Sequence, residues 1–62
     1  MDSAQIRKYR LSIKATQAEF AYDIGVSVVT VNRWEAGGSK PSRLAINKIK
    51  EHMKKKVKNE HD

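Results

Sequence analysis

Residues 16–25 have the apolar spacing and the end signals of a short helix. Apolar side chains recur there at positions that share one helical stripe: Phe20, Ala21 and Ile24. Thr16 and Glu19 make a capping box, in which the Thr16 hydroxyl accepts from the Glu19 N–H and the Glu19 carboxylate accepts from the Thr16 N–H. Gly25 supplies the positive φ that commonly ends a helix. The pattern predicts a helix over residues 17–24.

A second helix is predicted after only three further residues, Gly25-Val26-Ser27. Ser27 can cap its free N–H groups, and Gly37-Gly38 stops it, so the helix covers residues 28–36. Two helices joined by so short a turn indicate a helix-turn-helix, whose second helix can enter the major groove of DNA.

The two faces of this second helix differ in chemistry. At about 100° per residue, one face holds two residues suited to a core: Val31 and Trp34. The opposite face holds Val29, Asn32 and Arg33. Arginine can bond guanine, asparagine can bond adenine and valine can contact the thymine methyl group, so this face matches base edges. The angles alone are equally consistent with a second interpretation, in which Val28 and Val29 belong to the core and Arg33 is an ordinary surface charge.

A first and a fourth helix complete the pattern. Asp2 or Ser3 can cap the first helix, with Gln5 as the capping partner of Asp2, and its buried stripe is Ile6 and Tyr9. Pro41-Ser42 opens the fourth helix, with Ser42 as N-cap. Its core residues are spaced to close over the other three helices: Leu44 or Ala45, Ile46, Ile49 and Met53.

Length and charge favour a single domain that binds a polyanion. The 62 residues carry a net charge of +6. Residues 40–62 contain eight basic and three acidic residues, a net +5, whereas residues 1–39 contain five and four, a net +1. Such a balance favours salt-dependent binding to phosphates. A membrane-surface helix would need a broad apolar face, which Met53 and Val57 alone do not make.

Catalysis, cofactors and metals are not expected. The chain has no cysteine, and its two histidines are His52 and His61. Glu51 would point about 100° away from His52 on a helix, which disfavours a metal site. The sequence shows no nucleophile with an adjacent base and no paired carboxylates. It has no membrane-length apolar run and no signal-peptide core, so a soluble, cytoplasmic protein is expected.

Together these residues resemble the phage Cro and repressor type of helix-turn-helix regulators, also called Xre-like, over most of the chain. The shared pattern is Ile6, Arg10, Thr16-Gln17, Phe20-Ala21, Ile24-Gly25-Val26-Ser27, Val31, Trp34-Glu35, Gly37 and Pro41. The resemblance implies an all-α fold, a compact repressor-like bundle of four or five short helices, in a protein of prokaryotic or phage type.

The resemblance also implies roles for individual residues. Four residues face the bases: Val28, Val29, Asn32 and Arg33. Gln17 and its flanking backbone bind a phosphate, and Lys40 and Arg43 meet the DNA backbone. With the helix starts added, the expected phosphate-binding set is Thr16, Gln17, Ser27, Lys40, Ser42 and Arg43. Arg10 and Glu35 match a semi-buried ion pair that joins the first helix to the end of the third.

The link between the first two helices departs from this family pattern. Lys14 stands where the family commonly has glycine, so a left-handed cap there would be mildly strained. Leu11 and Ile13 point at least partly away from the first helix's buried stripe. They are either scattered surface residues or part of a contact with a partner chain.

We therefore expect a helix-turn-helix domain over residues 1–53 and a flexible basic tail over residues 54–62, which either solubilises the chain or contacts phosphates. The expected function is sequence-specific binding of double-stranded DNA as a small transcriptional repressor. One domain reads little sequence, which suggests a homodimer on half-sites about 10 base pairs apart.

Two alternatives stay open: an antitoxin that binds DNA and a protein partner, and a protein-interaction module on the same fold. RNA binding ranks lower, because no aromatic residues form a base-stacking platform.

Overall fold

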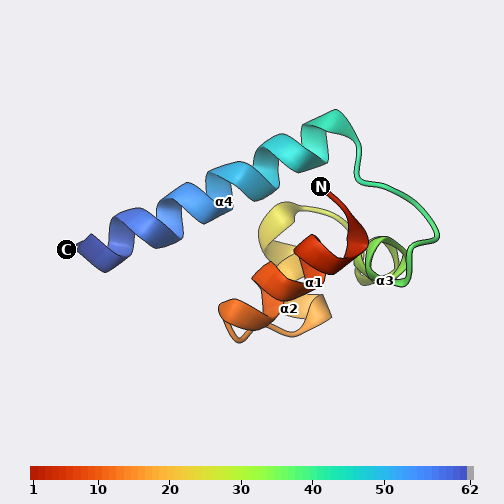
Figure 1. Ribbon diagram of the computed structural model, residues 1–62, viewed down its shortest axis with the longest axis horizontal. Helices are drawn as coiled ribbons and strands as arrows, with labels where there is room; N and C mark the ends of the chain where they lie inside the picture. Colours follow the sequence, from red (N-terminus) through yellow and green to blue (C-terminus); the bar gives the residue numbers. More distant parts are fainter. Residues whose placement is uncertain (62) are drawn as a thin grey trace.

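The computed structural model describes the backbone of residues 1–61 and the side chains of residues 1–55. Residues 1–61 form four helices and no strand: α1 (Ser3–Ser12), α2 (Gln17–Ile24), α3 (Val28–Ala36) and α4 (Arg43–His61). Three short helices form a compact group, and the longer α4 crosses it and extends beyond it (Figure 1). The expected all-α fold is confirmed.

Local end signals explain where the first two helices lie. Asp2 caps α1 through a capping box with Gln5, in which both bonds are present, at 2.8 and 2.9 Å. The box of Thr16 and Glu19 is complete at the start of α2, at 2.8 and 3.0 Å. Gly25 ends α2 at a φ of +89°, which a side chain would disfavour. The predicted helix over residues 17–24 is confirmed to the residue.

The third helix is bounded as predicted. The Ser27 hydroxyl accepts from the Thr30 N–H at 3.2 Å, and Gly37 closes the helix at a φ of +84°. Residues 25–27 are therefore the whole connection between α2 and α3. This short connection places α3 directly beside α2, and α3 also packs against α1.

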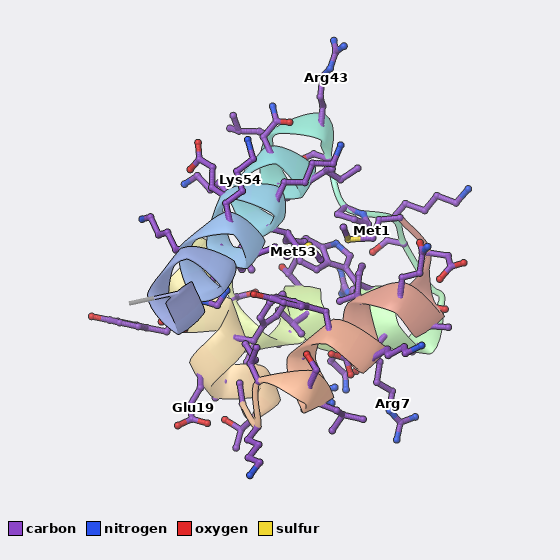
Figure 2. All side chains as sticks on the ribbon, turned by 60° about the vertical axis from the view of Figure 1, so that its left-hand side comes forward. Met1, Arg7, Glu19, Arg43, Met53 and Lys54 are labelled. Atoms are coloured by element: carbon purple, nitrogen blue, oxygen red, sulfur yellow. The ribbon has the colours of Figure 1, made fainter. Side chains whose placement is uncertain are left out.

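The core lies where the four helices meet. Its buried apolar residues are Ile6, Phe20, Ala21, Ile24, Val31, Trp34, Ala45 and Ile49. Tyr9 and Met53 pack against them and are partly buried. Figure 2 shows Met53 on the side of α4 that faces the other helices, whereas Arg43 points away from them.

At three positions, burial in the core could be decided only from the structure. Ala45 is buried and Leu44 is 69% exposed, which decides between these two candidates, and Ile46 is only partly buried. The interpretation of Ile13 as a surface residue is wrong, because it packs against the core as the C-cap of α1. Leu11 is exposed, as expected.

Lys14 lies in the left-handed region, at a φ of +57°, so the mildly strained cap considered for this position is present. Its N–H donates to the Leu11 carbonyl, and the Ala15 N–H donates to the Arg10 carbonyl. These two bonds turn the chain from α1 towards α2. The side chain of Lys14 is exposed, and the strain of this conformation comes from its Cβ, which lies close to a backbone carbonyl oxygen.

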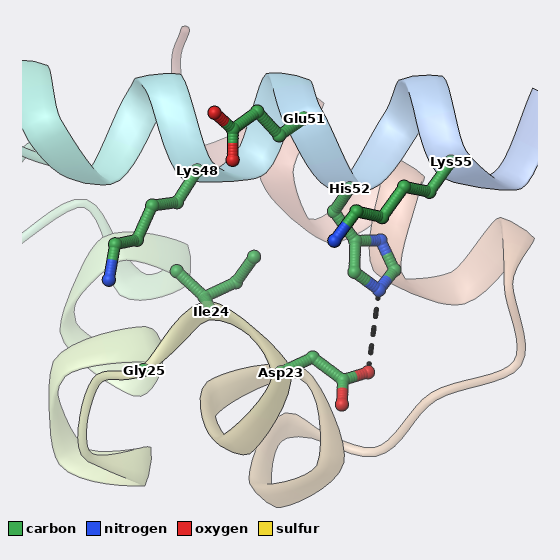
Figure 3. A pocket seen from close by; sticks show the side chains of 7 residues that line it. All are labelled: Asp23, Ile24, Gly25, Lys48, Glu51, His52 and Lys55. Atoms are coloured by element: carbon green, nitrogen blue, oxygen red, sulfur yellow. Dashed lines mark ion pairs between the residues drawn. The ribbon is translucent and has the colours of Figure 1, made fainter.

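A histidine attaches α4 to two other helices. His52 Nδ1 shares a hydrogen bond of 2.6 Å with the Tyr9 hydroxyl of α1, and its Nε2 lies 3.4 Å from Oδ2 of Asp23 on α2 (Figure 3). Burial, and after it the charge of Asp23, raises the pKa of the Tyr9 hydroxyl. The tyrosine therefore stays neutral in this contact at neutral pH.

The backbone of α4 remains helical through His61, past Lys54, where we expect a tail to begin. The side chains of residues 56–62 lie outside the described part of the chain. The division of the chain at residue 54 therefore stays a prediction.

Candidate nucleic-acid interface

The outer face of α3 is open to solvent. Val28 and Val29 are 44% and 56% exposed, and Asn32 and Arg33 are also exposed. The opposite face is closed, because Val31 and Trp34 belong to the core. The alternative that puts Val28 and Val29 in the core is therefore wrong. The exposed face offers two β-branched apolar residues, an amide and a guanidinium.

The starts of α2 and α3 each carry a capping hydroxyl. The Thr16 hydroxyl accepts from the Glu19 N–H at 3.0 Å, and the Ser27 hydroxyl accepts from the Thr30 N–H at 3.2 Å. Both residues are exposed. The other first-turn N–H groups of a helix have no helical acceptor and carry partial positive charge, so these two helix starts can receive an anion.

A forked ion pair connects α1 to the last turn of α3. Arg10 donates from Nε to Glu35 Oε2 at 2.7 Å and from Nη2 to Glu35 Oε1 at 2.9 Å. Its Nη1 donates to the Ala15 carbonyl at 2.8 Å. The two side chains are 11% and 5% exposed. The hydrogen bonds from Arg10 hold the pKa of the Glu35 carboxyl below its ordinary value, and the same pairing raises the pKa of the guanidinium.

The structure also joins residues that the sequence analysis treats separately. Gln17 Nε2 donates to Glu35 Oε1 at 3.1 Å, and Asn32 Nδ2 donates to Gln17 Oε1 at 3.3 Å. Gln17 thus lies between the exposed face of α3 and the buried ion pair. The spacing of Asn32 and Glu35 could have indicated that one side chain contacts both, because residues i and i+3 are neighbours on a helix.

Residues 37–42 connect α3 to α4 and form a basic segment together with Arg43; it begins with two glycines and contains a buried proline. Lys40 is exposed, whereas Pro41 is buried, a role that sequence reasoning missed. The Ser42 hydroxyl accepts from the Ala45 N–H at 3.2 Å and so caps α4, and Arg43 is exposed at its first position. Pro41 therefore anchors this basic segment between α3 and α4.

A shallow hollow lies between the end of α2 and α4 (Figure 3). It is lined by acidic and basic side chains together, among them Asp23, Lys48, Glu51 and Lys55. Within residues 1–55, no three histidine or acidic side chains are placed to hold a metal ion. No helix of the described chain is both long and apolar enough to cross a membrane.

A helix-turn-helix family model matches residues 6–57, which is most of the chain. The chain therefore belongs to this helix-turn-helix family, the Cro/repressor or Xre-like type of DNA-binding regulator that its sequence resembles. Comparison with curated proteins and with solved structures gives no significant match.

Proposed function

We propose that this protein is a sequence-specific repressor that reads duplex DNA with α3 in the major groove. The observation that carries the proposal is the exposed face of α3, which combines two valines, an amide and a guanidinium on a helix whose other face is fixed in the core. Ordinary solvated helix faces are mixtures of lysine and glutamate, and this face has neither.

Each of the four residues on the outer face of α3 has a base that it fits. Arg33 can donate two hydrogen bonds to guanine O6 and N7, and Asn32 can pair with adenine N6 and N7. Val28 and Val29 can contact thymine methyl groups. In this proposal the four residues supply the sequence preference.

Phosphate contacts fix the position of α3 in the groove. We assign them to exposed or partly buried residues at helix starts and in the basic segment before α4: Thr16, Gln17, Ser27, Lys40, Ser42 and Arg43. Helix N-termini favour anions, and the net charge of +6 favours association with DNA. These contacts supply affinity for any sequence.

A single α3 reads only a few base pairs, so we propose that two copies bind a two-fold site. Half-sites about 10 base pairs apart would place both recognition helices on the same side of the duplex. Occupancy of such a site beside a promoter would exclude other proteins and repress transcription.

The test is selection of the whole chain on a random duplex pool, followed by sequencing of the bound fraction. Enrichment of an inverted repeat supports a sequence-specific dimer and yields its operator. Strong, salt-sensitive binding without enrichment would instead indicate a phosphate-only binder. Lack of binding at low salt would favour a protein partner, as in the antitoxin and interaction-module alternatives.

A further inference from the structure

Four side chains form a continuous row of hydrogen bonds from the interior of the domain to the exposed face of α3. The row runs from Arg10 through Glu35 and Gln17 to Asn32. Its inner end is fixed, because the forked pair of Arg10 and Glu35 is buried. Its outer end is an exposed amide on the proposed base-reading face.

The direction of every bond in this row follows from its inner end. The Glu35 carboxylate, paired with a cation, can only accept, so Gln17 must present Nε2 to it. The Gln17 oxygen then faces α3, and only the NH₂ group of Asn32 can bond to it. The ion pair thereby determines which way round the Asn32 amide lies.

This orientation limits what Asn32 can offer to a base. One of its two N–H groups is used by Gln17, which leaves one N–H donor and the oxygen Oδ1 as acceptor. Adenine presents the complement in the major groove, the N7 acceptor and the N6 donor. Guanine presents two acceptors, N7 and O6, and would require two donors.

We propose that Gln17 is a positioning residue that makes Asn32 select adenine over guanine at one base pair. This inference rests on the proposed DNA-binding function. It gives Gln17 a part in specificity in addition to its proposed phosphate contact, and it gives the buried Arg10–Glu35 pair an influence on the choice of a base that neither residue touches.

The test uses the same random-duplex selection on the whole chain and on three variants. Asn32→Ala identifies the base pair that residue 32 reads, where the unmodified chain should select adenine. Gln17→Met, which keeps the length of the side chain without its amide, should lower the adenine-to-guanine ratio at that pair about fivefold or more. Lys40→Ala is the control, since it removes a proposed phosphate contact from the connection between α3 and α4, outside the row of hydrogen bonds, and should weaken all sequences alike.

The double variant of Gln17→Met and Asn32→Ala separates positioning from an independent contact. If Gln17 acts through Asn32, the double variant should show no further loss at that base pair beyond Asn32→Ala alone. Gln17→Ala serves as a second replacement if Gln17→Met unfolds, because alanine is well accepted in helices.

An unchanged adenine-to-guanine ratio in folded Gln17→Met, or selection of another base by the unmodified chain, would overturn this inference and leave DNA binding intact. Failure of the unmodified chain to enrich any sequence would overturn the proposed function, and the inference with it.

Discussion

Arg10 holds both carboxylate oxygens of Glu35 with two nitrogens of one guanidinium, at 2.7 and 2.9 Å, across the interface between α1 and α3. A third nitrogen of Arg10 bonds to the Ala15 carbonyl at the entry to α2. The pair therefore connects three segments at once. Both side chains are nearly buried, so each needs the other to balance its charge.

Removing one member of this pair should therefore destabilise the domain. We expect Arg10→Ala to lower the free energy of unfolding by about 3 kcal/mol or more, because it leaves the Glu35 charge buried without a partner. Urea unfolding followed by circular dichroism measures this. Base preferences of the variant, measured where it is folded, should change less than its stability. Equal free energies of unfolding for variant and unmodified chain would contradict the prediction.

The same pair makes the free energy of unfolding depend on pH in the acidic range. The pKa of Glu35 lies below its ordinary value of 4.5, with the hydrogen bonds from Arg10 as the largest cause. The unfolded chain therefore takes up this proton at a higher pH than the folded one. The stabilisation from this pair is complete at pH values well above the ordinary pKa of Glu35. It is lost as the pH falls through the lowered pKa of the folded chain.

Urea unfolding at several pH values, from about pH 6 to about pH 3, should show this loss. Glu35→Gln is the matched control, which should be less stable at neutral pH and should lose less stability on acidification. Parallel pH curves for the two chains would exclude Glu35 as the source.

Lys14 offers a simple way to stabilise the domain. Its φ of +57° is unfavourable for a side chain and free for glycine, so Lys14→Gly should raise the free energy of unfolding by up to about 1 kcal/mol, after the entropy of the added glycine is subtracted. The control is Lys8→Gly, an exposed position inside α1, which should lower stability by about 0.5–1 kcal/mol. Thermal melts that show the same sign for both variants would contradict the explanation.

The proposed contacts of Arg33 and Lys40 should be separable by sequence dependence. Arg33→Ala should cost about 1–3 kcal/mol on the selected operator and relax the preference at one base pair. Lys40→Ala should weaken binding to every sequence alike. It should also reduce, by about one, the slope of the logarithm of the binding constant against the logarithm of the salt concentration. Binding curves at several salt concentrations measure both. A uniform loss from Arg33→Ala would show that its contact is with a phosphate.

Features decided by neighbouring residues could be predicted from the sequence. The capping box of Thr16 and Glu19 and the glycine at position 25 act within one helical turn, so the bounds of α2 and α3 followed from them. The opposite faces of α3 followed from its angular period, with Val31 in the core and Asn32 exposed.

Features decided by packing between helices could not be predicted in this way. Ala45 and Leu44 are adjacent, and only the placement of α4 against the core of the other helices decides that Ala45 is buried and Leu44 is exposed. Ile13, at the end of α1, packs against a core that other helices complete. The bond between Gln17 and Asn32 joins positions 15 residues apart on two helices and needed their relative placement.

The guanidinium of Arg10 has a consequence for how the domain opens. It bonds to α3 and to the entry of α2 from its own place in α1, and Glu35 passes this connection on to Gln17. None of the three short helices can leave the others without breaking this one centre. Backbone amides inside α1, α2 and α3 should therefore exchange with deuterium through a common opening event, so that they behave as a single cooperative unit rather than as three separate helices.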